Sequence, residues 1–439
     1  MYNEGMRDWD EERTRPIKGG KKHRWLYFLL VIPWVIILCA AVYFLPPVYE
    51  RVHWRVMAFR AQVQYALWPP EEIVFLPVDR LDLDTIVAAT VEALTGAQPL
   101  QPGQGGSGGA NPSAKETPLA EAVRLVGVRY QAQRFNNCGP ANLSMALSFW
   151  GWAGDQDDTG AALRPKAEDK NVMPYEMAAY VEANTEFEVI WRVGGELKLV
   201  KGLLESGYPV MLEKGTDHDG WVGHYVLATG YDDRQGMLVV QDSLSGADML
   251  VSYTQVEDDW LAFNFTFLVV YPPEEEQQVR QLLGDWNDAE WAAGYALGRA
   301  NEAIQRLDGR EVYFAWFNKG SSHTMLGEYD AGALAYDYAF QLYRDLPLET
   351  RPWRMMWYQS GPYEAYFHAG RNWDVINLAE TSLYMLADRA LEEAYYWRGK
   401  AHLALGDTEQ ARKDFEAAVN LNPNFQLGYE ALRMLDVGL

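Results

Sequence analysis

The segment Asn137-Cys138-Gly139-Pro140-Ala141 opens an apolar stretch of helical character that runs to residue 150. The N–H groups of a first helical turn create a positive field, so a cysteine placed there favours thiolate over thiol. Pro140 has no N–H to leave unpaired in a first turn, and Gly139 lets a substrate approach the sulfur closely. The segment therefore predicts a presented thiol nucleophile, with a small buried residue at a helix start as the alternative.

Cys138 is predicted to be a free thiol. The chain has two cysteines, and the other one, Cys39, lies inside a long apolar run from which it cannot reach Cys138. In an exported protein an unpaired thiol invites oxidation, so a single retained cysteine needs a reason, and nucleophilic catalysis is the usual one.

Two histidines are candidates for the base that a thiolate nucleophile requires. Of the seven histidines, only His218 and His224 lie in the same stretch of chain as Cys138. His224 starts a strand-like run over 224–232, and a base at the end of a buried strand is held rigidly. His218 lies in the polar loop 216–220, whose Asp-His-Asp triplet would suit a metal ion, but no second cluster supports a metal site. The sequence favours His224 as the base and predicts no metal and no cofactor.

An orienting acid and an oxyanion donor can also be named. Asp242 ends the next strand-like run, so pairing of the two runs would bring its carboxylate near His224, and a turn role for this aspartate is compatible with that. Gln133 precedes Cys138 by five residues, and its amide could join the Cys138 N–H in binding an oxyanion. Gln131 is the competing donor, and a plain surface position is the alternative for Gln133.

Together, the segments 133–145, 223–232 and 240–242 resemble the papain-like cysteine peptidases of the bacteriocin-processing type, whose members cleave leader peptides after a double glycine. The resemblance covers roughly 123–271 and keeps the chain order cysteine, histidine, aspartate. It implies that the nucleophile, base, orienting acid and oxyanion donor are Cys138, His224, Asp242 and Gln133. Two features depart from that family: no transporter segment follows, as in peptidase-like relatives, and Ser243 stands where relatives often carry proline.

Six regions are predicted along the chain. They are a basic tail over 1–24, a transmembrane helix over 25–47, a juxtamembrane helical region over 48–95, a flexible Gly/Ser/Pro linker over 96–118, a papain-like cysteine peptidase domain over 119–273 and a tetratricopeptide-repeat domain over 274–439. An uncharged run of roughly 21 residues at ~1.5 Å per residue matches a ~30 Å hydrocarbon core. It is too long for a cleaved signal peptide, and the basic residues before it predict a cytoplasmic N-terminus and an extracytoplasmic body.

The peptidase-like region is expected to be α+β, because helical patterns come first and strands follow. Helices are predicted over 141–150 and 174–182, and strands over 187–193, 209–212, 224–231, 237–241 and 264–270, which are rich in Val, Tyr, Phe and Leu. The region after 274 is expected to be an all-α solenoid.

The C-terminal region resembles stacked tetratricopeptide repeats. In the clearest unit, over 395–423, Gly399 and Gly406 are followed by Ala411, Phe415 and Ala418 at the spacing of a packed helix pair. Similar units are predicted around 316–339 and, less regularly, over 358–385. Such stacks leave a concave face, for which Trp353, Trp357, Tyr363 and Tyr366 are candidate lining residues, with burial in the core as the alternative.

Composition limits the partners. There are 61 acidic against 38 basic residues and a net charge of −23, which argues against nucleic acid as a ligand. We expect a membrane-anchored, extracytoplasmic cysteine peptidase that cleaves a polypeptide and recruits substrate or a protein partner through its repeats, with the lipid bilayer contacted by the N-terminal helix. The rival interpretations are a non-catalytic binding scaffold and a papain-fold amidase or transpeptidase acting on the cell wall.

Overall fold

The structure is a computed structural model. It describes residues 24–45, 48, 55–56, 59–60, 63, 67, 72–77, 119–166, 169, 171–217, 220–386 and 388–437. The predicted basic tail, the linker over 96–118, most of the juxtamembrane region and His218 lie outside these residues. The chain divides into one unit over 1–62 and a second over 63–439.

The first unit contains the helix α1 (Arg24–Tyr43), which has Pro33 in its interior. In the part of the chain that the structure describes, no helix is both long and apolar enough to cross a membrane. The structure therefore does not support the transmembrane assignment of 25–47.

The second unit contains a seven-stranded sheet with its helices, which we call the sheet domain (residues 119–273). Its elements are β1 (Ala122–Arg124), α4 (Cys138–Phe149), α5 (Gln156–Leu163), α6 (Pro174–Asn184), β2 (Glu188–Arg192), α7 (Leu197–Glu205), β3 (Val210–Asp217), β4 (Trp221–Asp232), β5 (Met237–Asp242), β6 (Gly246–Ser252), α8 (Tyr253–Leu261) and β7 (Phe267–Tyr271). The strand order is β2-β7-β3-β4-β5-β6, β1 also pairs with β4, and all the pairings are antiparallel. Three of the helices described in this domain precede β2 and two more lie between later strands, so the domain is the predicted mixture of helices and strands.

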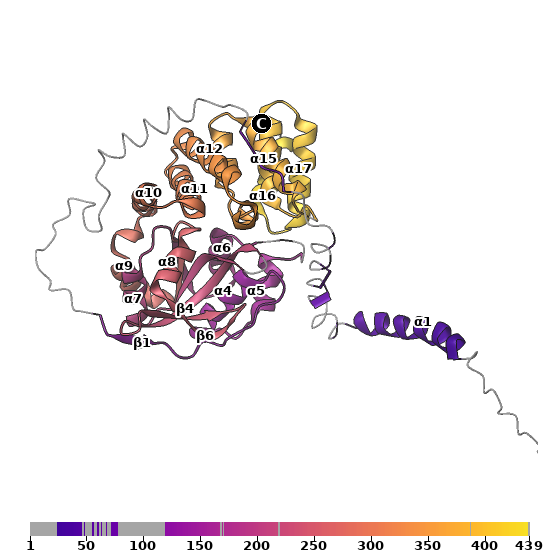
Figure 1. The fold of residues 1–439 in the computed structure, drawn as a ribbon, viewed down its shortest axis with the longest axis horizontal. Coiled ribbons are helices and arrows are strands. Elements are labelled where there is room, and N and C mark those ends of the chain that lie inside the picture. Colours follow the sequence, from indigo (N-terminus) through magenta and orange to yellow (C-terminus); the bar gives the residue numbers. More distant parts are fainter. Residues whose placement is uncertain are drawn as a thin grey trace, which may run out of the picture. The chain divides into compact units, whose positions relative to one another are not determined.

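Helices pack on both faces of the sheet, because the central strands carry apolar side chains on both sides (Figure 1). Met211, Leu227 and Leu268 pack with the core of α4 and α6, whereas their neighbours Leu212 and Val226 pack with the core that includes α7 and α8. Side chains of successive strand residues point to opposite faces, so these runs are continuously hydrophobic.

The sheet differs from the sequence-based expectation at β4 and β6, and the short strand β1 was not predicted either. Strand β4 begins at Trp221, so His224 lies three residues inside the strand and does not begin it. The strand is extended because Trp221 is buried, stacks with Phe263 at a centroid distance of 5.9 Å and pairs in register with Asp217. Strand β6 was not predicted, since its side chains are largely exposed and carry little apolar pattern.

The rest of the second unit is helical, and we call it the helical domain (residues 274–439). Its elements are η1 (Pro273–Glu275), α9 (Glu276–Leu283), η2 (Gly284–Asn287), α10 (Ala289–Arg306), α11 (Gly309–Met325), α12 (Tyr329–Asp345), η3 (Leu348–Thr350), α13 (Met355–Tyr358), α14 (Gly361–His368), α15 (Asn372–Tyr384), α16 (Glu392–Ala404), α17 (Thr408–Leu421) and α18 (Gln426–Asp436). The pairs α11/α12, α14/α15 and α16/α17 correspond to the three predicted repeat units.

Close helix packing explains the glycine of two repeats. A Cβ placed on Gly320 would lie 2.7 Å from the ring of Tyr336, and one placed on Gly399 would lie 2.7 Å from the ring of Phe415. Only glycine leaves room for the aromatic residue of the following helix. The candidates for the concave face are mostly core instead: Trp357, Tyr363 and Tyr366 are buried, because their rings fill the space between helices.

The helical domain shares a core with the sheet domain. Trp221 on β4 lies against Phe314 of α11, with ring centroids 5.6 Å apart, and against Tyr358 of α13. Asn264 donates a hydrogen bond to Ser322 Oγ at 3.0 Å across the same junction. The helical domain is therefore packed against the sheet domain, next to the strand that carries His224.

A short extended segment, residues 72–77, also packs on the helical domain. Phe75 is buried with its ring centroid 5.0 Å from that of Phe340. Glu72 accepts hydrogen bonds from Tyr343 Oη at 2.6 Å and from Arg351 Nη1 at 3.1 Å. These six residues are not helical, whereas the described residues 55–56, 59–60, 63 and 67 of the region predicted over 48–95 are.

Candidate active site

The helix that carries Cys138 starts at the cysteine itself. Helix α4 spans Cys138–Phe149, three residues earlier than predicted, and Ala141 N donates to Asn137 O at 3.0 Å as its first helical bond. The Asn137 side chain is turned away and donates to Gln156 Oε1 at 3.0 Å. The first N–H groups of a helix have no partner within it, so their partial positive charge surrounds the half-buried thiol.

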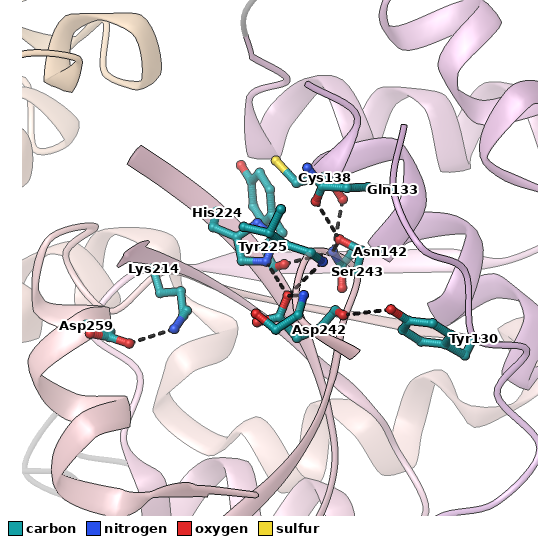
Figure 2. A network of polar contacts seen from close by, with 12 residues as sticks. Tyr130, Gln133, Cys138, Asn142, Lys214, His224, Tyr225, Asp242, Ser243 and Asp259 are labelled. Atoms are coloured by element: carbon teal, nitrogen blue, oxygen red, sulfur yellow. Dashed lines mark hydrogen bonds and ion pairs between the residues drawn. The ribbon is translucent and has the colours of Figure 1, made fainter. Parts of the chain in front are cut away.

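His224 is held by Asp242 from the neighbouring strand (Figure 2). The distance between His224 Nε2 and Asp242 Oδ1 is 2.8 Å, and His224 is buried. The same carboxylate oxygen accepts from Leu244 N at 2.8 Å and Ser245 N at 3.0 Å. Asp242 therefore both caps the turn after β5 and orients the imidazole, which leaves Nδ1 for the thiol.

The electrostatics of the three groups support an ion pair. Burial alone raises the pKa of the Cys138 thiol, but the hydrogen bond and charge of His224 outweigh it, so that the thiol pKa lies below its ordinary value. Burial lowers the pKa of His224, but the hydrogen bonds to Asp242 and Cys138 and their charges outweigh it and raise this pKa to about 9. Burial also opposes ionisation of Asp242, yet the hydrogen bond and charge of His224 keep its pKa below the ordinary value. The lowered pKa of the Cys138 thiol and the raised pKa of His224 thus both favour a thiolate that faces an imidazolium.

A lysine on the adjacent strand does not disturb this pair. Lys214 is opposite His224 in the register of β3 and β4. Its Nζ lies 2.6 Å from Asp259 Oδ2, and Figure 2 shows the two side chains forming their own pair. The lysine charge is therefore compensated locally.

The two glutamine candidates have different surroundings. Gln133 N donates to Ser243 O at 2.8 Å, and Gln133 Oε1 accepts from Ser243 Oγ at 2.8 Å. Gln131 is instead bound to α5, since its Oε1 accepts from Gln156 N at 2.9 Å. The structure thus brings Gln133 into one network with Asp242 and Cys138, and it places Gln131 elsewhere.

Three site residues were not found from the sequence. Asn142 Nδ2 donates to Cys138 O at 3.0 Å and to Tyr225 O at 2.8 Å, which ties α4 to β4. Tyr130 Oη donates to Asp242 O at 3.1 Å. Ser243 was noted only as a departure from the family pattern. The i+4 spacing of Asn142 from Cys138 was the one sequence signal available for this group.

A buried acidic cluster lies where the two domains meet, and we define it as Glu176, Glu392 and Glu393. Glu176 belongs to α6 and the other two to α16, and Asn422 Nδ2 donates to Glu392 Oε1 at 2.9 Å and Glu176 Oε1 at 3.3 Å. Burial and then the neighbouring carboxylates raise the pKa of Glu176 and Glu393 well above the ordinary value, and burial raises that of Glu392. Among the described residues, no group of His, Cys, Asp or Glu has an arrangement that could hold a metal ion.

Comparisons with known proteins found similarity to two family models and to a solved structure. Residues 125–267 match the model of the Peptidase_C39 like family, and residues 392–425 match that of the tetratricopeptide repeat. Among solved structures, a protein from Bacillus anthracis described as a candidate C39-like peptidase is similar, with 16% sequence identity and a TM-score of 0.29. The similarity covers 34% of this chain and 98% of that one. No curated protein matches this chain.

Proposed function

We propose that this chain is a cysteine peptidase with a papain-like sheet domain, in which Cys138 is the nucleophile. The observation that carries the proposal is the position of His224, whose Nε2 is bound by Asp242 at 2.8 Å while its charge lowers the thiol pKa. A nucleophile, a base and an orienting acid in this relation activate acyl transfer.

The reaction follows from these groups. The Cys138 thiolate attacks the carbonyl carbon of a peptide bond, and the carbonyl oxygen becomes an oxyanion. The Gln133 amide and the N–H groups at the start of α4 stabilise that oxyanion. Imidazolium His224 then protonates the departing amine, and a water molecule deprotonated by His224 releases the acyl group from the sulfur.

The helical domain would recruit a polypeptide substrate or a protein partner. Stacked repeats with matching residues in two units support this role, since such modules bind extended surfaces. Attachment to a membrane and an extracytoplasmic location remain predictions of the sequence.

Cleavage of a complex peptide mixture tests the proposal. The full chain should generate new peptide N-termini, measured by mass spectrometry, and Cys138→Ala should generate none. A parallel incubation with cell-wall muropeptides tests the amidase alternative, because thiol, imidazole and carboxylate serve any acyl transfer. Release of muropeptide products with no peptide cleavage would replace the proposed substrate class, and inertness toward both would favour a binding scaffold.

A further inference from the structure

The geometry points to Ser243 and Asn142 as positioning residues that fix which end of the Gln133 amide faces the thiol. A glutamine amide can present either its oxygen or its N–H groups, and only the N–H groups stabilise an oxyanion. This inference rests on the proposed acyl chemistry of Cys138 and names the residues that complete it.

The assignment of donors and acceptors in this hydrogen-bond network starts at Asn142. Its Nδ2 lies 2.8 Å from Tyr225 O and 3.0 Å from Cys138 O, and these two backbone carbonyls can only accept. A flipped amide would place an oxygen against both carbonyls. Asn142 Oδ1 is buried without a hydrogen-bond partner, so this orientation is imposed by the carbonyls although it leaves one acceptor unsatisfied.

Asn142 in turn determines the direction of the Ser243 hydroxyl. Asn142 Nδ2 lies 3.0 Å from Ser243 Oγ, and an amide nitrogen does not accept, so the hydroxyl oxygen can only accept at this contact, from an N–H that it shares with one of the carbonyls. The one hydroxyl proton is left for Gln133 Oε1 at 2.8 Å. Ser243 is 2% exposed, so its neighbours in the protein decide the direction of this proton.

Gln133 must then present its oxygen to Ser243 and its N–H groups elsewhere. Figure 2 shows the Gln133 side chain pointing toward Cys138. Gln133 is also anchored at its backbone, where its N–H donates to Ser243 O at 2.8 Å. The N–H groups of Gln133 are thus directed to the place where the oxyanion forms.

The turn that follows β5 therefore orients both the base and the oxyanion donor. Asp242 orients His224, and the next residue, Ser243, orients Gln133. Alanine or proline at position 243 would have no side-chain donor, so the Gln133 amide would be free to turn. Threonine would keep the hydroxyl.

The test measures binding of a short peptide aldehyde, N-acetyl-phenylalanyl-glycinal, to the full chain. The thiolate forms a C–S bond to the aldehyde carbon, and the π electrons of the C=O bond move to the oxygen, which leaves a C–O single bond. The resulting oxyanion takes a proton from His224 or accepts hydrogen bonds from the N–H groups of Gln133. Affinity is read from protection of Cys138 against iodoacetamide, a reagent whose reaction with the thiol needs no oxyanion stabilisation.

Ser243→Ala should weaken the affinity for the aldehyde about tenfold, which corresponds to the loss of one net hydrogen bond. The rate and pH profile of alkylation without aldehyde should stay unchanged. Ser243→Thr should restore protection. Ser144→Ala is the matched control, because Ser144 is also buried but its Oγ donates only to Ala141 O within α4. In a Gln133→Ala background, Ser243→Ala should have no further effect.

The inference would be overturned if Ser243→Ala kept full aldehyde protection, or if it also slowed alkylation in the absence of aldehyde. It would also be overturned if Ser243→Ala weakened protection as much in the Gln133→Ala background as in the unaltered chain. Absence of protection in the unaltered chain would also overturn it. If protection depends on Ser243 but no peptide is cleaved, the positioning role stands and the peptidase proposal fails.

Discussion

Replacing Asp242 with asparagine should uncouple the Cys138–His224 pair while keeping the shape of the turn. The asparagine oxygen can still accept from the N–H groups of Leu244 and Ser245, but the negative charge is gone. In the native chain the pKa of His224 is raised to about 9 from 6.5, and the difference of about 2.5 corresponds to about 3 kcal/mol.

Without that charge, the hydrogen bond and charge of Cys138 alone oppose the effect of burial on His224, so the pKa of His224 should fall. A less charged imidazole offsets burial of the Cys138 thiol less, so the pKa of that thiol should rise. The thiolate fraction at pH 6 to 7 should fall by about tenfold or more, since a shift of one in pKa is a factor of ten. The pH midpoint for alkylation should move upward.

The assay is the rate of iodoacetamide labelling between pH 5 and 10, followed by mass spectrometry of the Cys138 peptide. Cys39, the only other cysteine, serves as an internal reference. Asp258→Asn is the matched control, because this aspartate is exposed on α8. An unchanged pH profile in Asp242→Asn would refute the claim that Asp242 sets the charge state of the pair.

Three further predictions concern the rest of the chain. Ala411→Trp should lower the free energy of unfolding by about 1–3 kcal/mol in urea titration, because Ala411 is fully buried against Gly399, and unchanged stability would contradict the packed pair. The raised pKa of Glu393 means that its stabilising contribution is complete below the ordinary glutamate pKa and is lost as pH rises through the folded-state value. Glu393→Gln should therefore raise the melting temperature at pH 8 more than at pH 5, whereas exposed Glu416→Gln should not, and equal shifts at both pH values would contradict the buried acidic cluster. Protease added to intact cells should cut the linker around 103–109 if the body is extracytoplasmic, and cleavage only after lysis would exclude that topology.

The parts of the site that the sequence predicted depend on short-range patterns. Cys138 was found because its neighbours specify a helix start, and α4 does begin there. Asp242 was placed near His224 because consecutive strands usually pair, as β4 and β5 do. These inferences need only local geometry and one adjacent strand.

What the sequence did not predict depends on contacts between distant residues. The extension of β4 to Trp221 is stabilised by Phe314 and Tyr358 of the helical domain, about a hundred residues away in the chain. The role of Ser243 depends on Gln133 and Asn142, which only folding brings near it. Periodicity alone could not separate core from concave face for Tyr363 and Tyr366, because buried and ligand-binding aromatic residues have the same helical spacing.

The most direct test of the central claim is the mass of the intact chain during incubation with a peptide substrate, stopped in acid within the first turnovers. A nucleophilic Cys138 predicts a transient increase equal to the acyl part of the substrate, located on the Cys138 peptide and absent in Cys138→Ala. Peptide cleavage without any adduct, or an adduct that persists in Cys138→Ala, would contradict the account.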